Sequence, residues 1–414
     1  MRKLFRNIHQ LYTVSAHSRL FKAGKEMQDA GLISNAWMSI QDGNIEGVGG
    51  MDTCPSASEF QEVVECKNRI VFPGYCDSHT HIIFAATREG EFVDKIRGLS
   101  YEEIAKRGGG ILNSAARLRA TTEDELFDTA LARAKEMIGS GTTAFEVKSG
   151  YGLSTKDELK MLKVAARLKS SLPVTIKSTF LGAHAVPPEY KGHQAGYVDL
   201  IVQEMLPAIA AEGLADFVDV FCDEGFFTPD ESSRILEAAA KYGLKPKIHA
   251  NELAVSGGVQ VGVRHQALSV DHLERITEVE VEALKHSSTM PVALPGTSFF
   301  LRIPYTPARM ILDADLPLAL ASDFNPGSSP SGNMNLIFSL ACIQMRLLPE
   351  EALAALTLNG AYAMGIAETE GSLEPGKAGN FILTRPAQDL AVVPYYYGFG
   401  MVDQVWVRGE RFQG

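Results

Sequence analysis

Two histidines separated by one residue, His79 and His81, follow an apolar run at residues 70–76. Side chains at alternate positions of a β-strand point to the same face, so both imidazoles can reach one metal ion. The pair therefore predicts a metal site at the end of a strand. The chain has ten histidines, so this motif is weak evidence by itself, and further ligands must come from elsewhere in the sequence.

The elements that must position these histidines alternate between two patterns. From residue 70 onward, apolar β-branched runs alternate with helical segments, which favours parallel βαβ units. Eight such units indicate a closed barrel, because open sheets of this kind more often hold about six strands. We therefore expect an α/β fold with a (β/α)8 TIM-like barrel. The candidate strands are residues 70–76, 142–148, 174–181, 216–222, 245–250, 267–271, 288–294 and 316–322.

Helix starts are marked by threonine with glutamate three residues later, a capping box that satisfies free backbone N–H groups. This spacing occurs at Thr122, Thr155, Thr228 and Thr277, and we expect Gly243 to close the helix that begins near Thr228. The first strand-to-helix connection, from about residue 77 to 141, is far longer than a usual loop and contains Gly108-Gly109-Gly110. We expect it to hold extra helices and part of the mouth of the site.

The two ends of the chain differ from the middle. Residues 35–48 predict short strands joined by an Asp-Gly turn, and residues 371–383 have a similar composition. Strand-rich ends on either side of a barrel predict one small discontinuous β-sandwich domain. We place this domain at residues 1–68 and 369–414, and the barrel at residues 69–368.

Composition narrows the class of ligand. The 414 residues carry a net charge of -11 without a block of lysine or arginine, so we expect neither nucleic acid nor an anionic membrane as a partner. Five scattered cysteines fit reduced thiols, and polar residues interrupt the basic N-terminal stretch before a signal peptide can form. No apolar run approaches the ~20 residues that span a bilayer. We expect a cytoplasmic protein that acts on a small molecule.

Polar and titratable residues follow nearly every predicted strand, at the end of the barrel where active sites of this fold form. Each has an ordinary alternative: His249 could be a buried core histidine, Asp323 could cap its Asp-x-Asn-Pro turn, and His184 could order a loop. A shared rim with His79 and His81 favours a common site instead. The residues are Glu146, Lys148, Tyr151, His184, Asp223, His249, Glu252, Asp271, His272 and Asp323.

The histidine pair on strand one, histidines on strands five and six and an aspartate on strand eight resemble the metal-dependent amidohydrolase superfamily. Closer motifs resemble the imidazolonepropionase family within it, over residues from about 35 to 385. The motifs are Phe72-Pro73-Gly74 through His81, the Gly108–Ile111 turn, Glu146–Gly152, Phe180–Tyr190, Glu204–Pro207 and Asp323–Ser328.

The resemblance implies a metal site formed by His79, His81, His249 and Asp323. Three imidazoles and a carboxylate suit either zinc or iron, as a divalent or trivalent ion. A second metal normally needs a bridging carboxylated lysine at the end of strand four, where this sequence has residues 222–224, Cys-Asp-Glu. We therefore expect one metal ion per subunit.

The reaction implied is hydrolysis of the ring amide of 4-imidazolone-5-propanoate to N-formimidoyl-L-glutamate, a step of histidine degradation. Asp323 is then the candidate for accepting the proton of a metal-activated water, and His272 for stabilising the developing oxyanion. Glu252 is expected to orient the substrate or to carry a proton to the leaving nitrogen. The division of roles among these three residues is left open.

An anionic tail on the substrate calls for a cationic partner. Arg88 supplies a planar guanidinium that can hold a carboxylate with two hydrogen bonds. A departure from the family pattern is Asn251, where an acidic residue is expected, and it affects fine tuning of the pocket. The remaining positions that the resemblance assigns to substrate are Tyr151, His184, Glu252, Asn325, Gly327 and Ser328.

Two other readings use the same sequence features. Another cyclic amidohydrolase, or an aminohydrolase of a nucleobase, would share the metal ligands, but Arg88 and the turn at residues 325–328 suit an anionic tail better. A non-catalytic relative would be expected to lose metal ligands, and this sequence keeps all of them together with His272 and Glu252. Members of this superfamily commonly pair, so we expect a homodimer.

Overall fold

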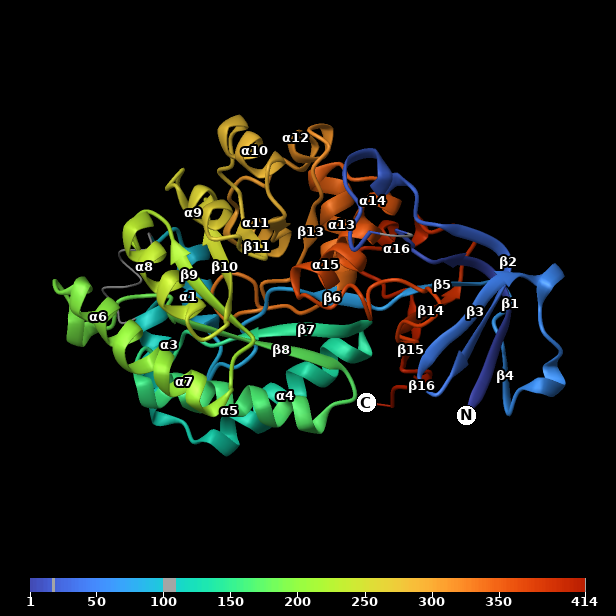
Figure 1. Ribbon diagram of the computed structural model, residues 1–414, viewed down its shortest axis with the longest axis horizontal. Helices are drawn as coiled ribbons and strands as arrows, with labels where there is room; N and C mark the ends of the chain where they lie inside the picture. The colour runs from blue at the N-terminus through green and yellow to red at the C-terminus, as the bar shows by residue number, and fades with distance from the viewer. Residues whose placement is uncertain (17–18, 100–108, 414) are drawn as a thin grey trace.

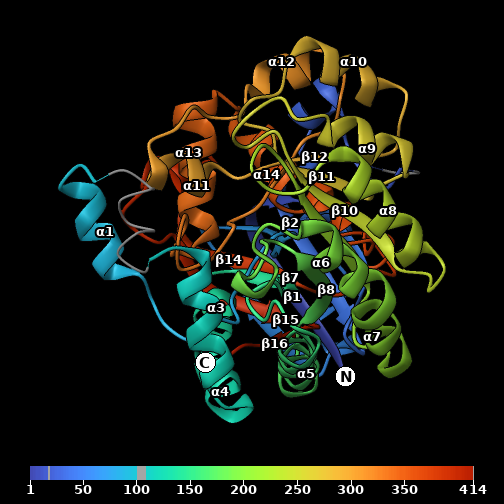
Figure 2. The ribbon, with the colours of Figure 1, turned by 90° about the vertical axis from the view of Figure 1, so that its left-hand side faces the viewer.

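A computed structural model describes residues 1–16, 19–99 and 109–413. These residues form two separate eight-stranded sheets. One is surrounded by helices and the other contains both ends of the chain; Figure 1 shows the second sheet at the right, with the N- and C-termini near it. In Figure 2 the helices ring the strands of the first sheet, and α1 stands at its margin.

The first sheet is the predicted barrel. All its strand pairs are parallel and follow one another in chain order. Backbone hydrogen bonds beyond the first and last strands close the ring, from Asp323 N to His79 O at 3.0 Å and from His81 N to Phe324 O at 2.9 Å. The strands are β6 Tyr75–Asp77, β7 Thr142–Lys148, β8 Thr175–Ala183, β9 Phe217–Cys222, β10 Lys245–Ala250, β11 Ser269–His272, β12 Met290–Ala293 and β13 Ala319–Leu320.

The single strand predicted at residues 70–76 is wrong in one respect, because the structure divides it at Gly74. Residues Arg69–Pro73 (β5) pair with the sheet of the termini, whereas Tyr75–Asp77 starts the barrel. Gly74 N donates to Asn380 O at 3.1 Å where the chain passes between sheets, and a side chain on Gly74 would collide with Thr143. Apolar residues continue on both sides of this change, and within the run the Pro73-Gly74 pair marks the break between the two strands.

The second sheet confirms a separate β unit built from both ends of the chain. Its order is β16-β15-β14-β5-β1-β2-β3, with β4 also paired to β1. The rings of Phe5, Phe381 and Trp406 meet in its core, with Phe5 centroid distances of 4.9 and 4.8 Å. The other strands are β1 Arg2–Tyr12, β2 Leu32–Gln41, β3 Asn44–Gly50, β4 Glu62–Glu65, β14 Phe381–Pro386, β15 Val402–Val407 and β16 Glu410–Arg411.

The long first connection contains the expected extra helices, α1 Glu89–Ile96 and α3 Ile111–Ala120. Of the predicted glycine turn, Gly108 lies outside the described residues, and Gly110 precedes α3 with a φ of 86°. Within the described ranges, no helix combines the length and apolarity needed to cross a bilayer. The other helices are α4 Glu123–Gly139, α5 Thr155–Ser171, α6 Gln194–Leu200, α7 Leu206–Glu212, α8 Pro229–Ala240, α9 Gly258–Arg264, α10 Glu278–Lys285, α11 Pro295–Leu301, α12 Ala308–Asp313, α13 Met334–Met345, α14 Pro349–Leu356, α15 Leu358–Ala363 and α16 Val392–Tyr395.

Capping boxes at Thr122, Thr228 and Thr277 are confirmed. The box predicted at Thr155 is wrong, because Ser154 caps α5 and bonds Asp157 instead. Glu158 turns inward and accepts hydrogen bonds from the backbone N–H groups of residues 150, 152 and 153 at 3.0, 2.8 and 2.8 Å. A buried carboxylate thus fixes the loop that follows β7.

Candidate metal centre

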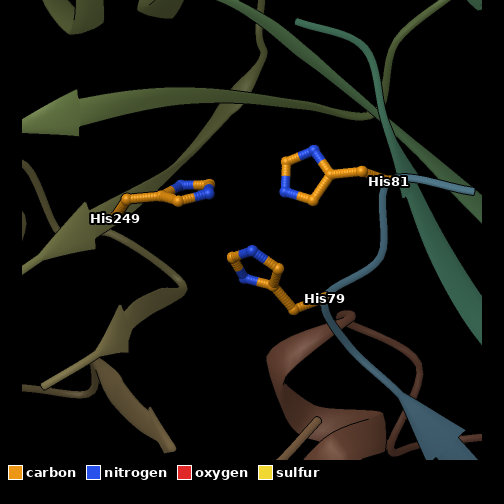
Figure 3. A group of neighbouring side chains, drawn as sticks. All are labelled: His79, His81 and His249. Carbon is orange, nitrogen blue, oxygen red and sulfur yellow. The ribbon is translucent and has the colours of Figure 1, made fainter. Parts of the chain in front are cut away.

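Three imidazoles meet at the end of the barrel. His79 and His81 lie on the segment that closes the ring, and His249 comes from β10 (Figure 3). One ring nitrogen of each lies within 4.8 Å of the others, and all three residues are buried. The structure therefore brings together the three predicted histidine ligands from segments far apart in the sequence.

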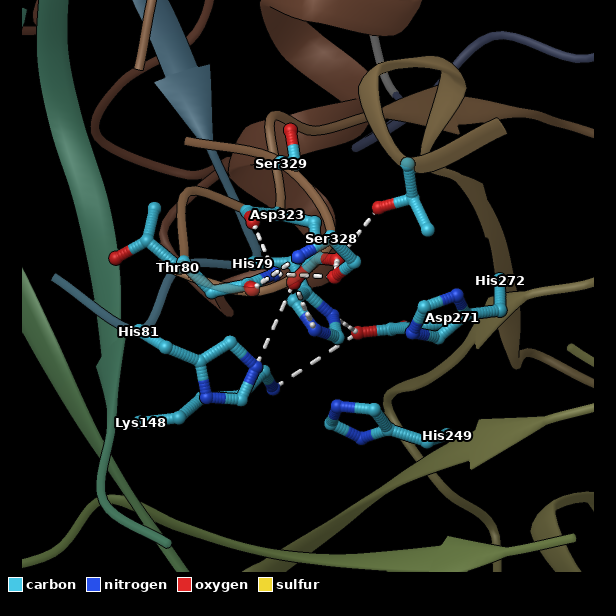
Figure 4. A network of polar contacts seen from close by, with 12 residues as sticks. His79, Thr80, His81, Lys148, His249, Asp271, His272, Asp323, Ser328 and Ser329 are labelled. Atoms are coloured by element: carbon cyan, nitrogen blue, oxygen red, sulfur yellow. Dashed lines mark hydrogen bonds and ion pairs between the residues drawn. The ribbon is translucent and has the colours of Figure 1, made fainter. Parts of the chain in front are cut away.

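Asp323 completes this group from the end of β13. Its Oδ1 lies 3.5 Å from His79 Nε2 and 3.6 Å from His81 Nε2. Its Oδ2 accepts hydrogen bonds from Thr297 Oγ1 at 2.6 Å and from Ser328 Oγ at 3.3 Å. One oxygen therefore faces the imidazoles while the other is held by hydroxyl groups (Figure 4). Thr297 was missed from the sequence, because a threonine inside a helix between two strands gives no signal of its own.

Two of the histidines, His79 and His81, are in the neutral form that binds a metal. Burial and the positive charge of Lys148 hold the pKa of His79 well below its usual value, and burial and His184 do the same for His81. Neutral imidazole offers a lone pair to a cation. His79 Nδ1 is 2.6 Å from Asp271 Oδ2, so it carries the proton and leaves the Nε2 lone pair free. Among the described residues, buried His79 Nε2 has no hydrogen-bond partner, and a cation fits this arrangement.

A buried network of charges lies beneath the imidazoles. Lys148 Nζ donates to Glu146 Oε1 at 2.7 Å and to Asp219 Oδ2 at 2.8 Å, and Lys247 also contacts Glu146. Asp219 Oδ2 is 3.0 Å from His249 Nδ1. Burial would raise the pKa of Asp219, but His249 and Lys148 outweigh it and hold this pKa well below its usual value. The network therefore keeps the carboxylate of Asp219 ionised next to His249. In the sequence, the only sign of this role was a charged residue inside an otherwise apolar strand.

His272 stands beside this centre between two carboxylates. Its Nε2 is 3.6 Å from Glu252 Oε2 and its Nδ1 is 3.5 Å from Glu274 Oε1. Burial opposes the charged ring, but Glu252 and Glu274 outweigh it and raise the pKa of His272 to about 10. Burial also raises the pKa of Glu252 to about 7, although His272 acts in the opposite direction. A cationic hydrogen-bond donor, His272, and a carboxyl group that titrates near neutral pH, Glu252, therefore lie together beside the metal centre. Sequence analysis did not identify Glu274.

The loop that carries Glu252 is built on Asp223. Both carboxylate oxygens of Asp223 accept backbone hydrogen bonds, from the N–H groups of residues 252, 253 and 254 at 2.9, 2.9 and 3.1 Å. Asn251, the departure from the family pattern, is buried with a φ of 56°. Asp223, at the strand end where a bridging lysine would hold a second metal, thus has a structural role.

Tyr151 and His184 line the side of the centre next to His81. The His184 ring stacks on the His81 ring, with their centroids 5.2 Å apart and an interplanar angle of 16°. The centroid of the Tyr151 ring lies 5.5 Å from that of the His184 ring. His184 Nδ1 is 3.1 Å from Gly150 O, and burial lowers the pKa of His184 to about 3, which keeps the ring neutral. These two predicted substrate residues therefore lie together, within reach of the same ligand.

The turn at residues 325–328 is held by its own asparagine. Asn325 Oδ1 accepts from the N–H groups of Gly327 and Ser328 at 2.8 Å each. Its Nδ2 donates to Asp323 O and to Ser328 Oγ at 2.7 Å each. The structure therefore shows Asn325 bonded within its own turn, which connects Asp323 to Gly327.

Arg88 reaches this turn from the start of α1. Its Nε donates to Ser114 Oγ at 2.9 Å, and its Nη1 lies 4.0 Å from Glu91 Oε2. Its guanidinium packs so closely over Gly327 that a Cβ added there would lie 3.1 Å from Cζ. The predicted carboxylate-binding arginine is thus brought beside the turn that carries Asp323.

Comparison with known proteins supports one chemical class. The sequence matches the amidohydrolase family over residues 70–411. It is 51% identical over 410 residues to the imidazolonepropionase of Christiangramia forsetii, covering 99% of this chain and 100% of that protein. It is 41% identical over 416 residues to the imidazolonepropionase of Geobacillus kaustophilus, covering 99% and 98% of the two chains.

Solved structures agree on the fold. A triazine hydrolase variant superimposes with a TM-score of 0.78 at 17% identity, covering 99% of this chain and 94% of that one. Guanine deaminase of E. coli gives a TM-score of 0.75 at 14% identity, covering 100% and 99%. At such low identity these matches establish the architecture alone.

Proposed function

The chain belongs to the imidazolonepropionase family of the amidohydrolases, and from this we propose how the residues at its barrel rim carry out the family's reaction. The chain hydrolyses the ring amide of 4-imidazolone-5-propanoate to N-formimidoyl-L-glutamate, a step of histidine degradation. This assignment of roles rests on the three buried imidazoles that meet at the barrel rim, with Asp323 Oδ1 turned toward His79 and His81.

His79, His81, His249 and Asp323 would hold one metal ion, zinc or iron. The donor set of imidazole nitrogens and a carboxylate oxygen suits both metals. When bound, such an ion lowers the pKa of a water molecule from ~15.7 to about 7 and so supplies hydroxide near neutral pH. The buried carboxylates of Asp271 and Asp219 orient two of the imidazoles toward this ion.

Proton transfer falls to Asp323 and Glu252. Asp323 Oδ1 is directed at the centre because Oδ2 is held by Thr297, so it is placed to take the proton of the attacking water. Glu252, with a pKa of about 7, is partly protonated at neutral pH and can deliver a proton to the ring nitrogen as the C–N bond breaks. His272, cationic beside it, donates a hydrogen bond to the oxyanion that develops on the ring carbonyl.

Recognition of the substrate depends on Arg88 for its carboxylate tail. The guanidinium is oriented by Ser114 and lies over the turn at residues 325–328, beside the residues that face the ring. Tyr151, His184 and the backbone of Gly327 and Ser328 complete the polar walls of the pocket. A planar fork matches a carboxylate with two parallel hydrogen bonds.

The ligand class, cellular location and oligomeric state form the remaining part of the proposal. Its ligand is a small anionic cyclic amide, and we propose that it works in the cytoplasm as a homodimer, without nucleic acid or a membrane as partner. The net charge of -11 supports the exclusion of polyanionic partners. Light scattering on the purified protein tests the dimer directly.

The deciding experiment follows the loss of imidazolone ultraviolet absorbance when purified protein meets freshly generated imidazolone propanoate, with elemental analysis for zinc and iron. We expect metal-dependent decay, about one metal ion per chain and no activity in Asp323→Asn. Metal-loaded protein that leaves this substrate intact would contradict the proposed reaction. A Glu212→Gln variant, on the exposed end of α7, serves as the control and should behave like the wild type.

A further inference from the structure

Lys95 links helix α1 to the turn that carries the metal-facing aspartate. Lys95 Nζ donates to Gly327 O at 3.1 Å and lies 5.7 Å from the centre of the Phe300 ring. The Phe300 ring also stacks on Phe92 of α1, with centroids 5.5 Å apart and an angle of 21°. One face of α1 is therefore fastened both to α11 and to the turn at residues 325–328.

Arg88 stands at the start of the same helix, so this attachment also sets its place. The guanidinium fills the space that a side chain on Gly327 would occupy: a Cβ there would collide with Arg88 Nη1. The obstacle is the far end of a flexible side chain, so a small residue at position 327 displaces the guanidinium and leaves the backbone in place. Gly327 is thus linked to α1 in two ways. Its carbonyl oxygen accepts a hydrogen bond from Lys95, and the guanidinium of Arg88 occupies the space where a side chain would be.

The turn connects this anchoring point to the catalytic end of the site. Asn325 bonds the backbone of both Asp323 and Gly327, and Ser328 donates to Asp323 Oδ2. Asp323 Oδ1 faces the imidazoles, whereas Gly327 faces Arg88. The distance from the reacting ring amide to the carboxylate-binding guanidinium is therefore spanned by a short, internally bonded turn.

We propose that Lys95 and Gly327 fix this distance and so select substrates by the length of their carboxylate tail. Lys95 is a positioning residue, because its hydrogen bond to Gly327 O holds α1 against the turn. Gly327 has no side chain, so the Arg88 guanidinium can lie against its Cα, at a fixed distance from the site of the substrate ring. The inference rests on the proposed function and adds to it a basis for choosing a propanoate tail over a shorter one. A carboxylate recognised with two hydrogen bonds tolerates little displacement.

The test compares Lys95→Met and Gly327→Ala with the wild type on three substrates: imidazolone propanoate, its acetate homologue and the ring without a tail. For both variants we expect the ratio of kcat/KM for propanoate to that for the tail-less ring to fall by roughly 10- to 100-fold, as for loss of a charged hydrogen bond. The loss should appear in KM, and the preference for propanoate over acetate should shrink. Lys156→Met, an exposed lysine on α5, is the matched control.

Metal content per chain, measured for every variant, reports whether the centre beneath the turn is intact. If Lys95→Met keeps the wild-type ratios, or if all three substrates lose equally, the positioning role is wrong. Lys95→Arg should recover much of the propanoate preference, because it restores a cation within reach of Gly327 O. Wild-type protein that hydrolyses none of the three substrates overturns the proposed function itself, a result distinct from a failure confined to the variants.

Discussion

Thr297 and Asp323 are joined by a buried hydrogen bond of 2.6 Å between the threonine Oγ1 and the aspartate Oδ2. Both residues are almost fully enclosed, and Asp323 has a φ of 52°. The bond separates the two carboxylate oxygens, because it holds one of them and leaves the other toward His79 and His81. A hydroxyl on α11 therefore determines which oxygen faces the imidazoles and would act as ligand and base in the proposed mechanism.

Replacing Thr297 with valine removes this hydroxyl while it keeps the shape of the side chain. We expect the affinity for zinc to fall by about 10- to 100-fold, the range for residues that orient a ligand. Competition with a chromogenic chelator measures this affinity in the absence of substrate. Thr297→Ser keeps the hydroxyl and should stay near the wild type; equal affinities in the valine and serine variants would argue against the orienting role.

Asp271 Oδ2 lies 2.6 Å from His79 Nδ1, and this contact favours the tautomer of the proposed ligand that carries its proton on Nδ1. In Asp271→Asn the amide can donate to Nδ1, which moves the ring proton to Nε2, the nitrogen that faces the centre. We expect weaker metal binding by about 10- to 100-fold, measured by the same chelator competition. Ser269→Ala removes only the bond from Ser269 Oγ to Asp271 Oδ1 and should have the smaller effect. The reverse order would contradict the tautomer argument.

The proposed role of Glu252 as a proton donor predicts that the reaction depends on pH. Burial raises its pKa to about 7, so its protonated form predominates below that pH and is lost above it. As a proton donor, Glu252 should cause kcat to fall as the pH rises through about 7. The Glu252→Gln variant should lack this limb at a much lower overall rate. A limb that persists in Glu252→Gln would have to be assigned to another group.

Arg88→Ala removes the residue that we propose binds the carboxylate of the substrate. We expect kcat/KM for imidazolone propanoate to fall by roughly 10- to 100-fold, chiefly through KM, because a charged hydrogen bond contributes about 1.5–3 kcal/mol. Steady-state kinetics on the tailed and tail-less rings provides the check. Arg117→Ala, on the last turn of α3, is a matched control. A loss in kcat alone would show that Arg88 acts on the ring and not on the tail.

Glu158 supports the loop after β7 by accepting three backbone hydrogen bonds from inside the protein. Glu158→Ala leaves these N–H groups buried without partners, at a cost of about 1–3 kcal/mol for each group left unsatisfied. We expect a clear drop in the thermal unfolding midpoint, measured by circular dichroism. Glu158→Gln keeps an acceptor oxygen and should lose less. Similar midpoints for both variants would count against this account.

Much of the architecture could be predicted from periodicity and turn signals. The strands at residues 142–148 and 245–250 were predicted with the bounds that the structure has, although charged residues and a histidine interrupt their apolar residues. The change of sheet at Gly74 was missed, because apolar residues lie on both sides of the Pro73-Gly74 pair that marks it. The box at Thr155 failed because a helix-start pattern cannot say whether its glutamate turns back to the cap or inward.

The site divides in the same way. Histidines and acids at strand ends could be located because the fold gathers strand ends on one rim. Residues that act through others, such as Thr297 and Glu274, became visible only when the structure brought distant segments together. Lys95 belongs to this group, because its partner is a backbone carbonyl, which any sequence provides.

The closure of the barrel has a consequence for how the protein is made. His79 and His81 follow the first strand of the barrel, and their backbone forms hydrogen bonds with residues 323 and 324, which follow the last strand. A chain still emerging from the ribosome contains both histidines long before it contains Asp323, because seven further strands of the barrel must be synthesised first. In the proposed four-residue site, a metal ion would therefore be bound late, when the ring closes and not when the first histidines are synthesised.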